Sequence, residues 1–104
     1  MRPIHLAQVD KRRPALVLTR ESVRGHLKWV TVAPITSRIR GLAVEVHVGP
    51  ANGLDHECVV SCDNITTIPA GELRERIGQL LPGQEEELGA AIRYALDLRL
   101  PPSS

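Results

Sequence analysis

The chain has 104 residues, a formal net charge of +1, 42% hydrophobic residues, one Trp, one Tyr and no Phe. This length fits a single domain over residues 1–104, whose core must consist of Val, Ile, Leu and Ala, a composition that favours β-structure. No apolar run reaches the roughly 18 residues that span a bilayer, and the N-terminus lacks a signal-peptide pattern, so we expect a cytoplasmic protein with no membrane partner.

The small net charge conceals an asymmetry along the chain. Residues 1–40 carry nine Lys and Arg against two acids, whereas residues 41–104 carry four against ten. A basic first part indicates a polyanion or an acidic peptide as partner. The alternative is that the two parts neutralise each other within the fold.

The first half of the chain predicts three short strands joined by polar turns. Ile4–Val9 is strand-like, and residues 10–13 form a tight polar connection to a second strand over Pro14–Thr19. The proline of this second strand stands at its start, where a missing N–H is tolerated. A polar loop with a helical turn near residues 21–23 then leads to a third strand over Lys28–Ile35.

The second half continues the pattern of short strands. Leu42–Val48 alternates apolar and polar residues, which predicts a half-buried strand. Cys58–Cys62 is typical of a buried strand, which the Asp-Asn pair after it breaks or bulges, with a continuation over Ile65–Ile68. A last strand is expected over Arg74–Leu80, giving five to seven strands in all.

One helix is expected after these strands, over about Gln84–Leu98. Leu88, Ile92, Ala95 and Leu96 follow the spacing of an apolar helical stripe. Short strands with turn signals followed by one helix predict a mainly β fold, a small antiparallel barrel with an appended C-terminal helix.

The two cysteines, Cys58 and Cys62, do not suggest a metal centre. Four residues apart on an extended strand they lie too far from each other for a disulfide, and with His56 they do not converge on a tetrahedral site. We therefore expect no metal and no cofactor, and interpret both thiols as small buried apolar groups.

Four segments occur in an order that is typical of a known family. They are Arg13-Pro14-Ala15-Leu16-Val17-Leu18-Thr19, Pro34-Ile35-Thr36-Ser37, Asn52-Gly53-Leu54 and Cys62-Asp63-Asn64-Ile65-Thr66-Thr67-Ile68. With these segments the chain resembles the MazF/PemK-like toxins of type II toxin–antitoxin systems, relatives of the CcdB fold. The resemblance extends over roughly residues 4–98.

The resemblance implies a homodimeric, SH3-like barrel that cleaves single-stranded RNA at short sequences without a metal and so inhibits translation and growth. It also implies a cognate acidic antitoxin, MazE-like, that occupies the RNA groove. Because some relatives poison DNA gyrase instead, the alternative is a non-catalytic, CcdB-like toxin that binds a protein target. A regulatory module that has lost cleavage is a third interpretation.

Two positions depart from the pattern of the family. Only residues 10–12 separate the first strand from Arg13, where family members usually carry a longer, glycine-bearing loop. Ser61 stands where some relatives have a catalytic arginine. Both departures bear on how this chain recognises and cleaves RNA.

The candidate catalytic residues are Arg13 and Thr36, which the resemblance supports, and Asp63, provided that folding brings it close to the substrate. RNA cleavage by its own 2′-hydroxyl requires loss of a proton from that hydroxyl, stabilisation of the phosphorane and protonation of the 5′-oxygen. Arg13 would stabilise the charge on the phosphorane, Thr36 would hold a non-bridging oxygen, and Asp63 would accept the 2′-proton. Their structural alternatives are an exposed cation, a turn-capping hydroxyl and an Asx turn.

Further basic and hydroxyl side chains are candidate RNA contacts, although each is also an ordinary surface residue. They are Lys11, Arg12, Ser37, Arg38 and Arg40. We expect Trp29 to pack at the edge of the barrel, with stacking on a base as the alternative.

Overall fold

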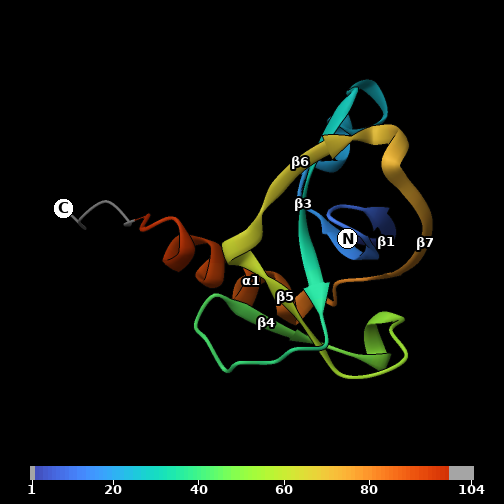
Figure 1. Cartoon of the computed structure of the whole chain (residues 1–104). Coiled ribbons are helices and arrows are strands. Elements are labelled where there is room, and N and C mark those ends of the chain that lie inside the picture. Colours follow the sequence, from blue (N-terminus) through green and yellow to red (C-terminus); the bar gives the residue numbers. More distant parts are fainter. Residues whose placement is uncertain (1, 99–104) are drawn as a thin grey trace.

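The computed structural model describes residues 2–98, which form seven strands and one helix (Figure 1). The elements are β1 (Pro3–Gln8), β2 (Arg12–Val17), β3 (Trp29–Thr36), β4 (Glu45–Val48), β5 (Cys58–Ser61), β6 (Thr66–Pro69), β7 (Leu73–Gln79) and α1 (Pro82–Ala95). Short 3-10 turns connect them at Glu21–His26, Pro50–Asn52, Cys62–Asn64 and Ala70–Glu72. The predicted mainly β class with a C-terminal helix is confirmed.

The seven strands form one curled antiparallel sheet. Its order is β4-β5-β3-β2-β1-β7, and β6 also pairs with β3. Figure 1 shows the sheet bent into a half-barrel, with α1 packed beside β4. No helix within residues 2–98 is long and apolar enough to cross a membrane.

β5 and β6 are two halves of one strand that lies along the same edge of β3. Continuing the β5 ladder would place Ser61 opposite Pro34, whereas continuing the β6 ladder would place Asn64 there. The register therefore shifts by three residues, and the 3-10 turn Cys62–Asn64 supplies them. The break that the sequence predicts at this Asp-Asn pair is confirmed.

The position of the break follows from Pro34. The carbonyl of Thr31 accepts a hydrogen bond from the N–H of Leu18 at 2.8 Å, so Thr31 directs its backbone groups toward β2. Because these groups alternate along a strand, those of Pro34 point to the opposite edge, where β5 and β6 lie. Proline has no N–H to donate there, so the neighbouring strand loses a ladder bond where it turns away.

The core is divided between the two faces of the sheet. Ala33 and Ile35 of β3 belong to a large cluster that includes Leu88 of α1. Val30 and Val32 belong to a smaller cluster on the other face. Both cysteines are buried, as expected from the sequence, and burial raises the pKa of the Cys62 thiol to about 11.

Three expectations from the sequence are wrong in detail. β4 begins at Glu45 rather than Leu42, because the Glu45 carboxylate accepts the backbone N–H of Leu42 and folds the preceding residues into a loop. α1 ends at Ala95, so Leu96 lies beyond the helix and is exposed rather than part of its apolar stripe. Trp29 does not pack at the edge of the barrel but is 58% exposed.

The connection between β4 and β5 is fastened to the start of α1 by amide groups. The Asn52 amide donates to the Gln84 side chain at 2.6 Å and to the Gln79 carbonyl at 3.0 Å. Gln84 in turn donates to the His47 carbonyl at 3.1 Å. The backbone of Asn52 passes so close to Gly78 that a Cβ there would lie 1.6 Å from the Asn52 oxygen.

Candidate active site

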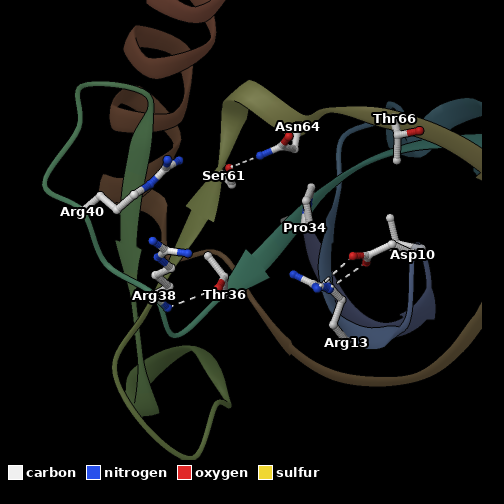
Figure 2. Close-up of a pocket in the computed structure, with 10 residues that line it drawn as sticks. Asp10, Arg13, Pro34, Thr36, Arg38, Arg40, Ser61, Asn64 and Thr66 are labelled. Carbon is white, nitrogen blue, oxygen red and sulfur yellow. Dashed lines mark hydrogen bonds and ion pairs between the residues drawn. The ribbon is translucent and has the colours of Figure 1, made fainter.

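A hollow of about 600 Å³ lies beside β3 at the break between β5 and β6. Figure 2 shows Arg13 and Asp10 on one side of it and Arg38 and Arg40 on the other, with Thr36 between them. Three guanidinium groups against one carboxylate make this hollow a site for an anion.

Arg13 is positioned by its place in β2. Continuing the β2–β3 ladder beyond Ala15 and Pro34 places Arg13 opposite Thr36. Its side chain is only 20% exposed, and its Nη2 donates to Asp10 Oδ2 at 3.1 Å while its Nε lies 3.1 Å from Asp10 Oδ1. Nη1 has no hydrogen-bond partner in the described part of the chain and faces the hollow (Figure 2). That nitrogen can donate to an incoming oxyanion.

Asp10 is ionised in this setting. Partial desolvation raises the pKa of its carboxyl, but hydrogen bonds from the backbone N–H groups of Asp10 and Lys11 and the charge of Arg13 outweigh this effect. The net result is a pKa below the ordinary value. A carboxylate beside a guanidinium in an open hollow can accept a proton from a substrate hydroxyl.

Thr36 is the last residue of β3 and lines the hollow. Its Oγ1 accepts a hydrogen bond from the backbone N–H of Arg38 at 3.1 Å, which is the turn-capping contact considered from the sequence. An accepting hydroxyl keeps its own proton free. Thr36 can therefore cap the turn and donate to an oxyanion at the same time.

Ser61 and Asn64 form the wall of the hollow at the break. The Asn64 amide nitrogen donates to Ser61 Oγ at 2.8 Å, which joins the two ends of the turn (Figure 2). Ser61 is buried, whereas Asn64 is exposed. This wall carries hydrogen-bonding groups without a charge.

Glu45 fixes the loop that carries Arg38 and Arg40. Its carboxylate accepts the backbone N–H groups of Arg40 and Leu42 and lies 3.7 Å from the Arg40 guanidinium. The hydrogen bond from Leu42, followed by those from Arg40 and Gly41, lowers the pKa of Glu45 despite its desolvation. The loop thus holds its two arginines at the edge of the hollow.

The structure does not bring all predicted site residues together. Asp63 is turned outward by the 3-10 turn and lines a different hollow, beside Tyr94 at the end of α1. Its position gives no support to the predicted role as general base. Lys11, Arg12 and Ser37 are exposed and lie outside the hollow that Arg13 lines.

The structure adds residues that sequence reasoning did not assign to the site. Asp10, Ser61, Asn64 and Thr66 all line the hollow. The spacing of Asp10 three residues before Arg13 could have indicated a pair across a tight turn. The other three depend on the register shift between β5 and β6; the sequence predicted a break there but not a shift of three residues. Within residues 2–98, no group of three or more His, Cys, Asp or Glu side chains is placed to hold a metal ion.

Comparisons with known proteins agree with this geometry. The family described as "PemK-like, MazF-like toxin of type II toxin-antitoxin system" matches residues 3–96. The chain is 60% identical over 98 residues to endoribonuclease MazF3 of Mycobacterium tuberculosis, covering 94% of this chain and 95% of that protein.

Solved structures give the same result. The M. tuberculosis toxin MazF-mt6 superposes with a TM-score of 0.92 at 58% identity, covering 94% of this chain and 99% of that one. A mycobacterial endoribonuclease in complex with its cognate antitoxin shares the fold, with a TM-score of 0.83 at 24% identity, covering 95% of each chain. The chain therefore belongs to the family of PemK-like, MazF-like toxins of type II toxin–antitoxin systems.

Proposed function

We propose that this protein is an endoribonuclease toxin that cleaves single-stranded RNA at a specific sequence in the hollow lined by Arg13. The observation that carries the proposal is the convergence of a guanidinium, a carboxylate and a free hydroxyl proton, from Arg13, Asp10 and Thr36, in one cationic hollow. Membership of the toxin family supports the same activity.

The proposed chemistry is attack of the substrate's own 2′-oxygen on the adjacent phosphorus. The 2′-O–P bond forms, the P–O5′ bond breaks, and the products carry a 2′,3′-cyclic phosphate and a 5′-hydroxyl. Asp10 accepts the proton of the 2′-hydroxyl, and the leaving 5′-oxygen takes a proton from water. Arg13 and Thr36 donate to the non-bridging oxygens as charge develops on them. None of these steps requires a metal.

Asp10 replaces Asp63 as the proposed base. Asp10 pairs with Arg13 inside the hollow, whereas Asp63 lies in another one. Arg38 and Arg40 are proposed to hold phosphates on either side of the scissile bond. Lys11, Arg12 and Ser37 are retained only as contacts of RNA that extends beyond the hollow.

We also propose a cognate acidic antitoxin, a homodimeric state and a cytoplasmic location. The mycobacterial endoribonuclease with the same fold binds an antitoxin. An acidic segment would find three arginines in the hollow and would compete there with RNA. The gyrase-binding alternative is not favoured, since the chain matches an endoribonuclease over almost its whole length.

The test is incubation of the purified protein, in EDTA, with a pool of single-stranded RNA and a matched DNA pool. We expect RNA fragments with 2′,3′-cyclic phosphate ends, intact DNA, and loss of cleavage in Arg13→Ala and Thr36→Ala. Thr36→Ser should retain activity, because it keeps the hydroxyl. Intact RNA with a folded wild-type protein would refute the proposal.

A further inference from the structure

A second hollow, of about 620 Å³, lies on the other face of the β3–β6 pair. Thr31 and Trp29 of β3 line it, and they alternate with Val30 and Val32, which face the side of the active site. The proposed cleavage chemistry makes no use of this hollow.

Its most prominent feature is Trp29, the single tryptophan of the chain. The indole is 58% exposed, although a side chain of this size is normally packed. Leu27 beside it is also 44% exposed. A large aromatic surface is therefore left open to a ligand.

Positive charge surrounds the indole. Arg20 and Lys28 line the same hollow, and neither has an ion-pair partner among the side chains of residues 2–98. No carboxylate of the described residues lines it. An exposed aromatic flanked by unpaired cations is the combination that binds single-stranded nucleic acid, the ring stacking on a base and the cations holding its phosphates.

Hydroxyl groups complete the surface. Thr31 Oγ1 and Thr67 Oγ1 lie 3.3 Å apart across β3 and β6 and both line the hollow. Only one of the two can donate to the other, so one hydroxyl proton remains for a base edge or a ribose. These groups suit a nucleotide better than a purely apolar peptide side chain.

The two hollows are separated by a single strand. Thr66 and Thr67 are consecutive residues of β6 on opposite faces, and Thr66 lines the active site while Thr67 lines the second hollow. β6 pairs only with β3 among the described strands, so its other edge is open (Figure 1). A chain leaving the active site can pass over that edge and reach Trp29.

We propose that RNA flanking the cleavage site crosses the open edge of β6 and stacks a base on Trp29, with Arg20 and Lys28 binding its phosphates. This subsite rests on the proposed RNA-cleaving function and extends it to a requirement for a flanking nucleotide. The stack adds affinity for longer substrates and leaves the chemical step at Arg13 unchanged.

The experiment uses Trp29 as its own reporter, because no other tryptophan contributes to the emission. An RNA sequence that the protein is known to cleave is synthesised with a 2′-O-methyl group at the scissile nucleotide. This analogue binds but cannot react, because it lacks the attacking hydroxyl. It is titrated into the protein as a series of oligonucleotides with flanks of increasing length on either side. We expect quenching of Trp29 fluorescence by half or more, and only beyond a certain flank length on one side.

Kinetics give the second readout. Trp29→Ala should raise KM for a long substrate by about tenfold or more, leave kcat unchanged and leave a minimal substrate unaffected. Trp29→Phe should keep KM for the long substrate close to the wild-type value, because it retains an aromatic ring. Tyr94→Ala is the matched control, because Tyr94 is an aromatic residue that is 69% exposed and lies outside both hollows. This variant should leave KM unchanged for both the long and the minimal substrate.

Three outcomes overturn the inference. Unchanged Trp29 emission on binding of an RNA that the wild type cleaves would refute the subsite and leave the proposed function standing. A response to an acidic antitoxin-like peptide but not to RNA would assign the surface to a protein partner. Shielding of Trp29 from acrylamide in the free protein would assign it to a contact between copies. Absence of any cleavage would instead refute the proposed function itself.

Discussion

Both oxygens of the Asp10 carboxylate face the guanidinium of Arg13, each 3.1 Å from a different nitrogen. The pair holds the Arg13 side chain with one edge against Asp10 and the other toward Thr36. A phosphate that enters the hollow therefore meets a guanidinium whose orientation is already fixed, which lowers the reorganisation that cleavage requires.

Arg13→Lys tests the importance of this orientation. An ammonium keeps the charge but cannot bind Asp10 and a phosphate through separate, fixed edges. We expect cleavage to fall by about 10²-fold while the Kd for uncleavable RNA changes little. Single-turnover cleavage and equilibrium binding measure the two effects. Arg74→Lys is the control, since Arg74 pairs with Glu72 outside the hollow and should behave as the wild type; a wild-type cleavage rate for Arg13→Lys would show that charge alone matters.

Asp10→Asn tests the proposed base. The amide keeps the size and removes both the negative charge and the proton acceptor, so we expect a loss of about 10²–10⁴-fold in kcat. RNA binding should be retained or tightened, because a negative charge leaves the hollow. Asp63→Asn, made in parallel, should cleave at the wild-type rate. A normal rate for Asp10→Asn would remove Asp10 from the mechanism.

The pH profile provides an independent check on Asp10. Its folded pKa lies below the ordinary value of 3.8, so the carboxylate is charged throughout the range above about pH 4. Cleavage that depends on this base should therefore show no acid limb above about pH 4, and should be lost as the pH falls through the folded pKa. An acid limb in kcat/KM near about pH 6, with the protein still folded, would point to a different base.

Glu45→Gln should destabilise the loop that carries Arg38 and Arg40. The carboxylate accepts two backbone N–H groups, and charge-assisted bonds of this kind are worth about 1–2 kcal/mol together once solvent is considered. Because the folded pKa of Glu45 is depressed, its stabilisation is present above the unfolded value of 4.5 and is lost as the pH falls through the folded pKa. Urea unfolding at about pH 7 and about pH 3.5 should show a wild-type–mutant difference that shrinks at low pH. Glu75→Gln, in an exposed ion pair, should change stability by less than about 0.5 kcal/mol.

Gly78→Ala tests the crossing of β7 by the β4–β5 connection. A Cβ would lie 1.6 Å from the carbonyl oxygen of Asn52, a backbone atom held in place by the Asn52–Gln84 hydrogen bonds. We expect a loss of about 3 kcal/mol or more in the free energy of unfolding. Gly71→Ala is the matched control, because a Cβ at that position would meet no atom of the described residues within 4 Å. Equal stability of the two variants would show that the crossing can move apart.

Local patterns predicted most of the fold, because the strands are short alternating or apolar segments separated by polar turns. Leu42 was wrongly placed in a strand, because the Glu45 carboxylate binds its backbone N–H and holds it in the preceding loop. Leu96 was wrongly placed in the helix, because the chain leaves the helix before Asp97, which has a left-handed backbone conformation. Arg13 and Thr36 were identified through the family resemblance, and the register of β2 against β3 makes them neighbours. Asp63 and Asn64 are adjacent in sequence but lie on opposite sides of a turn, and only tertiary structure decides which of the two lines the hollow.

The three-residue turn between β5 and β6 also restricts how the chain can vary in length. Since side chains alternate along a strand, an odd shift exchanges the two faces, and Ile68 thereby enters the smaller core cluster. If one residue is deleted and the turn keeps its length of three, Ile68 pairs with Thr31 instead of Val30, which rotates Ile68 to solvent and brings Thr67 into that core. We expect insertions and deletions at this turn to be tolerated only in steps of two residues. Such a step changes the length of the active-site wall and keeps each side chain of β6 on its present face of the sheet.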